Sequence, residues 1–210
     1  MAKFEIVPGL VYVDRETWGA DPDHPRKGYK VGRDRRTHVI IHHTVMPDTS
    51  DASSNLWETE KEVFGMMRKL QTVRPDLGMD VPYSFVVFFM AGSTKIMVCE
   101  GRGEDRTGAH TKGHNSQGIG ISFAGDFENK SIKHYDIAKR MFLVSYFLGW
   151  LKYSPSHPDY GTFKPMKNLG SMRPQDRAVY FHQDFKKTAC PGKKLIPHVA
   201  QVSFIDPRLE

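Results

Sequence analysis

Cysteine is scarce in this sequence. Cys99 and Cys190 are the only two in 210 residues, so a framework of several disulfide bonds is excluded. A run of about 18 apolar residues is also missing, which excludes a membrane-spanning helix. The stretch 1–20 contains no continuous apolar segment that ends in small residues, and this argues against a cleaved signal peptide. We therefore expect a protein made in the cytoplasm without a signal peptide and without membrane insertion.

Blocks of basic residues are absent as well, although the net charge is +6 and the pI is near 9.2. Scattered Lys and Arg side chains are typical of a solvated surface. The positive charge favours an anionic partner, such as nucleic acid, a membrane surface or an anionic cell wall, without naming one. The length suits a single domain over 1–208, with a core over about 13–200. We expect a monomer. Leu209 and Glu210 resemble a cloning scar and are set apart from this domain.

Short apolar segments rich in β-branched and aromatic residues predict four buried strands, over 37–45, 82–90, 94–100 and 118–126. The turn after Met90 joins the second strand to the third and predicts a hairpin. Strands and helices alternate along the chain without an internal repeat. The predicted fold class is therefore α/β, with a central mixed β-sheet flanked by helices.

Helices are predicted over 53–70, 135–153 and, in short form, 193–202, and a loop rich in Pro, Gly and Ser over 154–178. The first helix has Ser53 or Ser54 as its candidate N-cap. Its apolar residues at helical spacing are Trp57, Phe64, Met67 and Leu70. The second helix is apolar on more than one face, which predicts that it packs on the sheet. In the last helix, Pro197 marks the first turn or a break.

The motif HQDFKKTACPG places His182 and Cys190 close together near the end of the chain. Zinc binds imidazole nitrogen and thiolate sulfur, and catalytic zinc sites keep one position open for water. A third ligand would come from elsewhere. His42 or His43 is a candidate, because strand alternation turns one of them toward the site. A cysteine protease with Cys190 as nucleophile is the rival interpretation. The helical zinc-protease motif H-E-x-x-H is absent.

Five segments in order along the chain resemble the zinc-dependent type 2 N-acetylmuramoyl-L-alanine amidases and peptidoglycan-recognition proteins, a family that includes phage amidases. They are VDRETWGA (13–20), HVIIHHTV (38–45), VPYSFVV (81–87), GAHTKGHNSQGIGISFAGDF (108–127) and HQDFKKTACPG (182–192). The first is similar to the family's N-terminal signature in Arg15, Trp18, Gly19 and Ala20. Together the segments touch most of residues 13–195. The resemblance implies the fold of this family as a single domain.

A zinc site is the main implication of the resemblance. The first histidine of the pair binds zinc in the family, which selects His42. His43 is expected to be a packed residue or one that supports a ligand. His182 and Cys190 match the second and third ligands. A zinc-bound cysteine is a thiolate, so Cys190 is not expected to form a disulfide with Cys99 while metal is bound.

Tyr83 stands at the place of the family's active-site tyrosine, which implies contact with the attacking water or the substrate oxyanion. Thr188 falls where some members have lysine and others threonine, and is the second candidate catalytic residue. Ala124 occupies the position of a catalytic glutamate in the recycling amidases, so the chain resembles the members that use tyrosine and threonine. Asp184 either orients a ligand histidine or is a surface or turn-capping residue.

The segment 108–127 resembles the part of the family that crosses the substrate groove. It implies that His110, Lys112 and Asn115 contact the peptide or the sugar of the substrate. Lys112 has the charge to attract a substrate carboxylate. Trp18 is expected to lie in the core rather than to serve as a platform for sugar.

The function implied is zinc-dependent cleavage of the amide between N-acetylmuramic acid and L-alanine in peptidoglycan. Without a signal peptide, a wall hydrolase suits a phage endolysin that reaches the wall after membrane permeabilisation. Peptidoglycan is the expected partner, and no nucleic acid is expected. The alternative is a non-catalytic peptidoglycan-binding or regulatory module of the same fold.

Overall fold

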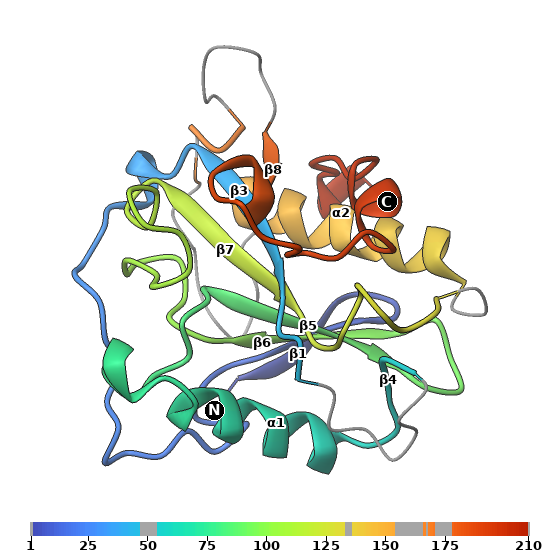
Figure 1. Cartoon of the computed structure of the whole chain (residues 1–210). Helices are drawn as coiled ribbons and strands as arrows, with labels where there is room; N and C mark the ends of the chain where they lie inside the picture. The colour runs from blue at the N-terminus through green and yellow to red at the C-terminus, as the bar shows by residue number, and fades with distance from the viewer. Residues whose placement is uncertain are drawn as a thin grey trace.

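Eight strands form one mixed β-sheet in the computed structural model, which describes residues 2–46, 54–132, 136–153, 166, 168–170 and 178–209. Along the sheet the strands follow the order β1-β2-β6-β5-β7-β3-β8, and β4 pairs with β5 beside this path (Figure 1). Their bounds are β1 Lys3–Val7, β2 Leu10–Val13, β3 His38–His43, β4 Leu56–Trp57, β5 Phe85–Met90, β6 Ile96–Glu100, β7 Gly118–Phe123 and β8 Val179–Phe181.

Both kinds of strand pairing occur in this sheet. The hairpin β5–β6 is antiparallel, whereas β3 lies between β7 and β8 and runs parallel to both. The predicted hairpin and the predicted mixed sheet flanked by helices are therefore confirmed. Parallel strands end at a common edge, so the carboxyl ends of β7, β3 and β8 meet there. Ligands of open α/β sheets bind outside this kind of edge.

The N-terminal hairpin β1–β2 is not predicted by the sequence patterns above. Its two strands flank a turn at Pro8 and Gly9, where Gly9 has a φ of 88°. Only β2 is tied to the rest of the sheet, in parallel register with β6, from Leu10 opposite Ile96 onward. Such a strand depends on a distant partner, and its own short sequence carries little of the signal.

Three α-helices lie among the described residues, at the bounds α1 Glu60–Thr72, α2 Ile137–Tyr153 and α3 Ile196–Val199. Short 3₁₀ helices are η1 Arg33–Arg35, η2 Pro75–Leu77, η3 His182–Asp184 and η4 Pro207–Leu209. The prediction of α2 is confirmed. The last predicted helix exists in a shorter form, with Pro197 in its first turn. Most of the predicted loop 154–178 lies outside the described residues.

The predicted start of the first helix is wrong. Trp57 belongs to β4, where it pairs with Met90 of β5 and donates from Nε1 to the carbonyl of Ala124 at 3.2 Å. The helix begins after Thr59, whose hydroxyl accepts from the N–H of Glu62. Ser54 instead accepts from the N–H of Leu56, and the other candidate cap, Ser53, lies outside the described residues. Pairing with β5 overrides the helical spacing at Trp57.

The two faces of the sheet carry separate cores. Helix α2 covers one face, as predicted, and Phe147 meets Phe85 of β5 edge-to-face at 5.1 Å. Helix α1 covers the other face (Figure 1). Trp57 and Trp18 are buried in the core on this face. Strand alternation separates the two sets, since Phe85 and Val86 are successive residues of β5 that belong to different cores.

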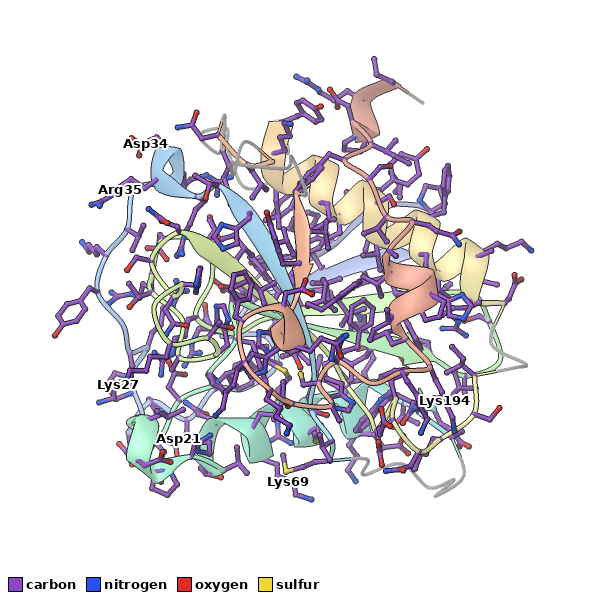
Figure 2. The ribbon with its side chains drawn as sticks, turned by 45° about the horizontal axis from the view of Figure 1, so that its top comes forward. Asp21, Lys27, Asp34, Arg35, Lys69 and Lys194 are labelled. Atoms are coloured by element: carbon purple, nitrogen blue, oxygen red, sulfur yellow. The ribbon has the colours of Figure 1, made fainter. Side chains whose placement is uncertain are left out.

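Charged side chains are distributed widely over the surface. The labelled residues Lys27, Arg35, Lys69 and Lys194 lie at separate places around the molecule, which agrees with the scattered charge of the sequence (Figure 2). No helix in the described part of the chain is both long and apolar enough to cross a membrane.

Glu100, at the end of β6, is a charged residue whose carboxylate is buried. It accepts from a guanidinium nitrogen of Arg26 at 2.8 Å and from the backbone N–H of Arg15 at 3.3 Å. Burial raises the pKa of Glu100 to about 7, although the positive charge of Arg26 opposes the rise. These contacts tie the segment before β3 to the sheet.

The raised pKa of Glu100 predicts a pH-dependent loss of stability. A carboxyl group that binds its proton more tightly in the folded state stabilises that state at low pH. The benefit is lost between the unfolded pKa near 4.5 and the folded pKa near 7. Relative to Glu100→Gln, the free energy of unfolding of the wild type should fall by about 2–3 kcal/mol between pH 5 and pH 7. Urea titration of both proteins at several pH values measures this, and a constant difference would contradict it.

Candidate metal centre

The three side chains expected to bind zinc lie together at the carboxyl edge of the parallel strands. One nitrogen of His42, one of His182 and the Sγ of Cys190 all lie within 4.8 Å of one another. His42 is the second-last residue of β3, and His182 directly follows β8. Cys190 lies on the turn after η3. Because β8 runs parallel to β3, residues far apart in the sequence reach one place.

Strand alternation separates the two adjacent histidines of β3. His42 faces the cluster, whereas His43 is buried and its Nδ1 accepts from the backbone N–H of Phe127 at 3.2 Å. The structure therefore places His43 as a packed residue, in agreement with the sequence-based expectation. Its backbone still serves the site, because its N–H points at the Sγ of Cys190 over 3.4 Å.

The turn that carries Cys190 is held by the backbone. The carbonyl of Cys190 accepts from Gln183 at 3.1 Å, and its N–H donates to the hydroxyl of Thr188 at 3.2 Å. Gly192 follows with a φ of 97°, and a Cβ there would lie 2.4 Å from the carbonyl carbon of Phe127. Glycine is required at this position for both reasons, which explains the Pro-Gly that ends the motif.

Burial controls the protonation of the cluster. It lowers the pKa of His42 well below its ordinary value, with smaller contributions from the neighbouring histidines. It also lowers the pKa of His182. Both imidazoles are consequently neutral near pH 7, and each has a lone pair to bind a metal. Burial raises the pKa of the Cys190 thiol to about 12, so the metal-free thiol is protonated. A reactive nucleophilic cysteine has the opposite shift.

The chemistry and spacing of these side chains fit a zinc ion. Zinc binds sulfur at about 2.3 Å and nitrogen at about 2.0 Å, and tetrahedral geometry separates two such atoms by about 3.5 Å. The Nδ1 of His42 lies 3.6 Å from the Sγ of Cys190. Two imidazoles and one thiolate would leave a fourth position for water or substrate, which is the pattern of catalytic zinc sites.

Tyr83 lies beside the cluster. Its ring centre is 5.2 Å from that of His42, and it precedes β5 by two residues. Burial, with a smaller contribution from the neighbouring Cys190, raises the pKa of Tyr83 to about 12. The phenol therefore keeps its proton at neutral pH and can donate a hydrogen bond.

Two other residues of the last motif have clear local roles. Thr188 is half-buried and binds the backbone of Cys190 through its hydroxyl, as described above. Asp184 accepts from the N–H of Phe181 at 2.8 Å and so caps the η3 turn. Of the two alternatives predicted for Asp184, the structure favours turn capping.

The loop 108–117 carries the three predicted substrate contacts. His110 is buried, Lys112 is exposed and Asn115 is half-buried. The Oδ1 of Asn115 accepts from the N–H groups of His110 and Thr111, at 2.9 and 3.0 Å. The Nδ1 of His110 lies 3.1 Å from the Nε2 of His42. The structure thus brings His110 to the metal cluster and leaves Lys112 at the surface of the loop.

Arg36 is a site-building residue that sequence reasoning missed. Its fully buried guanidinium donates to backbone carbonyls of the segment that leads into and forms this loop, namely Glu104, Arg106, Asn115, Ser116 and Gly118. Burial lowers its pKa to about 10, which still leaves it charged at neutral pH. In the sequence it is one of several basic residues before β3, and nothing there separates it from its exposed neighbours.

Trp18 and Ala124 also have defined places. Trp18 is fully buried and donates from Nε1 to the carbonyl of Glu100 at 2.8 Å, so its predicted place in the core is confirmed. Ala124 is buried in the same core.

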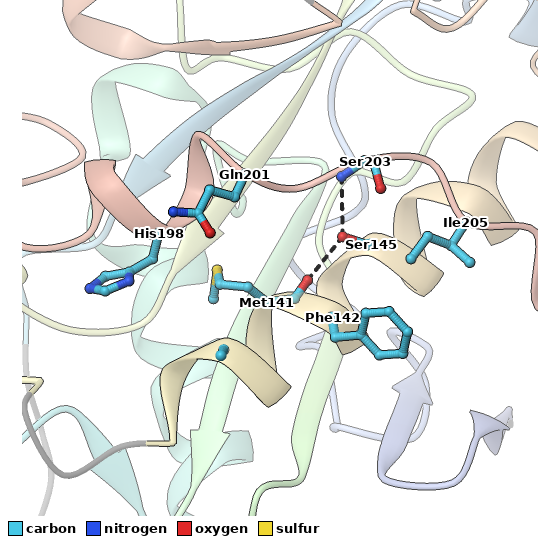
Figure 3. Close-up of a pocket in the computed structure, with 8 residues that line it drawn as sticks. Met141, Phe142, Ser145, His198, Gln201, Ser203 and Ile205 are labelled. Carbon is cyan, nitrogen blue, oxygen red and sulfur yellow. Dashed lines mark hydrogen bonds between the residues drawn. The ribbon is translucent and has the colours of Figure 1, made fainter.

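A pocket of about 280 Å³ lies elsewhere, between α2 and the C-terminal segment (Figure 3). The hydroxyl of Ser145 accepts there from the N–H of Ser203 at 3.1 Å and donates to the carbonyl of Met141 at 3.0 Å. None of the predicted site residues lines it. Its lining residues are Ala138, Met141, Phe142, Ser145, His198, Gln201, Ser203 and Ile205.

Comparison with solved structures decides the fold. Drosophila PGRP-LB is similar with a TM-score of 0.64 over 93% of this chain and 96% of that chain, at 21% identity. A mutant of that protein, in complex with tracheal cytotoxin, gives 0.61 over 90% and 93%, at 21% identity. The chain has the peptidoglycan-recognition-protein fold. The expected fold is confirmed.

Sequence relatives carry the names expected for this fold. Peptidoglycan-recognition protein 1 of Holotrichia diomphalia is 36% identical over 117 residues, which cover 54% of this chain and 53% of that protein. Human N-acetylmuramoyl-L-alanine amidase is 28% identical over 193 residues, covering 85% of this chain and 26% of the human protein. The chain therefore matches about half of the first relative and about a quarter of the second. No family model matches it.

Proposed function

We propose that this protein is a zinc-dependent N-acetylmuramoyl-L-alanine amidase, which cleaves the amide between N-acetylmuramic acid and the L-alanine of the stem peptide. The observation that carries the proposal is the convergence of His42, His182 and Cys190 on one place, at the carboxyl edge of a sheet with the peptidoglycan-recognition-protein fold. The name of the human relative supports the reaction.

In this proposal the three side chains hold the zinc ion. Bound zinc supplies a Lewis acid for the amide carbonyl and lowers the pKa of water toward about 7. The neutral imidazoles of His42 and His182 bind without losing a proton, whereas the thiol of Cys190 must release one. The N–H of His43, directed at the sulfur, stabilises the resulting thiolate.

Tyr83 and Thr188 are the proposed catalytic residues. The protonated phenol of Tyr83 donates a hydrogen bond to the carbonyl oxygen as negative charge develops on it. The hydroxyl of Thr188, which lies two residues before the ligand cysteine, orients the attacking water. Neither role needs a carboxylate, which suits a chain with Ala124 at the glutamate position.

Peptidoglycan is the proposed partner, bound by a monomer along the loop 108–117. Lys112 is exposed on this loop and attracts substrate carboxylates, and Asn115 is accessible beside it. The complex of a structural relative with tracheal cytotoxin supports ligand binding by this fold. We also propose phage lysis as the biological setting, supported by the resemblance to phage amidases. A gene for a membrane-lesion protein beside the coding sequence would test this setting.

Removal of metal gives the decisive test of the reaction. Purified cell wall treated with the zinc-loaded protein should release peptides with new N-terminal L-alanine. Dialysis against EDTA should reduce the rate to background, and about one equivalent of zinc per chain should restore it. Full activity of a protein verified as metal-free would contradict the zinc mechanism.

The second candidate function is a binding module without catalysis. It is favoured if the zinc-loaded protein binds soluble muropeptides but never releases L-alanine termini. The donor set argues for the enzyme, because a position for water remains beside the three ligand side chains.

A further inference from the structure

His110 lies directly behind His42, on the side away from Cys190. The Nδ1 of His42 faces the Sγ of Cys190 at 3.6 Å, and its Nε2 faces the Nδ1 of His110 at 3.1 Å. The two rings meet edge-to-face, with centres 5.0 Å apart and an angle of 74°. One nitrogen of His42 is thus directed at the metal cluster and the other at a second imidazole.

The backbone of the site holds the His110 ring in this place. A Cβ at Gly120 would lie 2.3 Å from the ring, and a Cβ at Gly108 would lie 2.2 Å from it. The ring therefore occupies space that only glycines leave open. The side chain of Asn115 binds the N–H of His110, and Arg36 binds the carbonyl of Asn115, which anchors the loop. His110 has little freedom to turn away from His42.

This arrangement bears on which nitrogen of His42 carries the proton. A neutral imidazole has one N–H and one lone pair, and binding a metal requires the lone pair on the nitrogen that faces it. For His42 that nitrogen is Nδ1, so Nε2 must carry the proton and needs an acceptor. Histidines that bind metals usually donate this second N–H to a nearby group. The Nδ1 of His110 is in position to accept it.

We propose that His110 is a positioning residue, which accepts a hydrogen bond from the Nε2–H of His42 and thereby holds His42 in the tautomer that binds metal through Nδ1. The proposal rests on the zinc site of the proposed function. In this state His110 carries its own proton on Nε2, a buried nitrogen without a hydrogen-bond partner among the described residues. An unpaired buried donor costs free energy, and in this proposal the hydrogen bond at the Nδ1 of His110 has to offset that cost.

Thr111 is the only other hydrogen-bonding group recorded at this contact in the described part of the chain. Its hydroxyl lies 3.1 Å from the Nδ1 of His110 and 3.4 Å from the Nε2 of His42. Because the His42–His110 contact is the shorter one, the imidazole of His110 is the better acceptor for the Nε2–H of His42. The hydroxyl of Thr111 lies beside both ring nitrogens. This role for His110 differs from the substrate contact expected from the sequence, and the burial of its side chain fits the new role.

Zinc affinity of two His110 variants tests the proposal. Competition with a chromophoric chelator should show about 10- to 100-fold weaker binding for His110→Leu, which lacks an acceptor. His110→Asn should stay within about threefold of the wild type, because its Oδ1 can take the place of Nδ1 as acceptor. His114→Leu is the matched control, since His114 is on the same loop but packs on Phe185 with ring centres 4.0 Å apart.

A second measurement reads the tautomer without any metal. Nitrogen-15 NMR of the metal-free wild type should show His42 protonated at Nε2, with a mixture of tautomers in His110→Leu. Protonation at Nδ1 in the wild type would overturn the proposal, even if the Leu variant fails to fold. Equal loss of affinity in the Asn and Leu variants would also overturn it, because a packing role alone would then suffice. A wild type that binds no zinc would refute the proposed function, whereas the NMR result would still judge the hydrogen bond.

Discussion

Cys190→Ser is expected to lose both the zinc ion and the amide cleavage. The serine hydroxyl does not ionise near neutral pH and is a poor zinc ligand, so two imidazoles would remain to hold the metal. Zinc supplies several kcal/mol of charge stabilisation in the transition state. The rate of L-alanine release should therefore fall by at least about 10³-fold. Elemental analysis of dialysed protein should show about one zinc per chain in the wild type and almost none in the variant.

Cys99→Ala is the matched control for this prediction. Cys99 is the other cysteine of the chain, is fully buried in the core under α1, and has a raised pKa because of burial. This variant should lose some thermal stability but keep its zinc and its activity. If Cys190→Ser lost its zinc and remained fully active, the metal mechanism would be refuted.

The reactivity of Cys190 toward an alkylating agent distinguishes an amidase from a cysteine protease. A nucleophilic thiol would have a lowered pKa and react with an alkylating agent in the metal-free protein at neutral pH. Burial raises the pKa of Cys190 to about 12 instead. We therefore expect slow alkylation without metal and protection with zinc, while a protease would lose activity on adding zinc.

Tyr83→Phe is expected to reduce kcat by about 10²–10³-fold, the effect of removing one hydrogen-bond donor from a developing oxyanion. The phenylalanine ring would keep the packing against His42, whose ring centre lies 5.2 Å from that of Tyr83. Zinc content, zinc affinity and thermal stability should therefore stay close to those of the wild type. Steady-state kinetics on a soluble muropeptide, alongside elemental analysis, measures both parts of the prediction.

Tyr29→Phe provides the control for removal of a phenol. Tyr29 is 85% exposed and takes no part in the cluster, so this variant should behave as the wild type. A loss of zinc in Tyr83→Phe would show that the tyrosine supports the metal site rather than the reaction. An unchanged kcat would remove Tyr83 from the proposed mechanism.

Local patterns in the sequence were sufficient to predict the elements that have a continuous apolar run or a strong periodicity. The apolar runs of β3, β5, β6 and β7 and the long helix α2 were all predictable. The hairpin β1–β2 was not, because β2 depends on pairing with β6 across much of the chain. Trp57 shows the same effect, since β5 recruits it into a strand although its spacing suits the helix. Long-range strand pairing decides such cases.

For the candidate site, too, some features follow from the sequence and others from long-range packing. The sequence by itself predicted the ligand types, two imidazoles and a thiol, and their order along the chain. It placed Tyr83 within the predicted strand 82–90, whereas β5 begins two residues later. Alternation along β3 left His42 and His43 as alternatives, and only resemblance separated them. The tertiary structure brings the imidazole of His42, rather than that of His43, to Cys190, because the parallel pairing of β8 with β3 places the last motif at one face of the sheet.

Only the tertiary structure revealed the groups that contact and position the candidate ligands and the loop beside them. Arg36 is one basic residue among several in the sequence, and it becomes the anchor of the loop 108–117 because its guanidinium is buried among carbonyls. His110 was predicted from resemblance to contact the substrate, and the structure shows that its ring lies against the Nε2 of His42. Residue type and spacing can specify which atoms are able to bind a metal. The packing of distant segments decides which nitrogen faces the site and what holds it there.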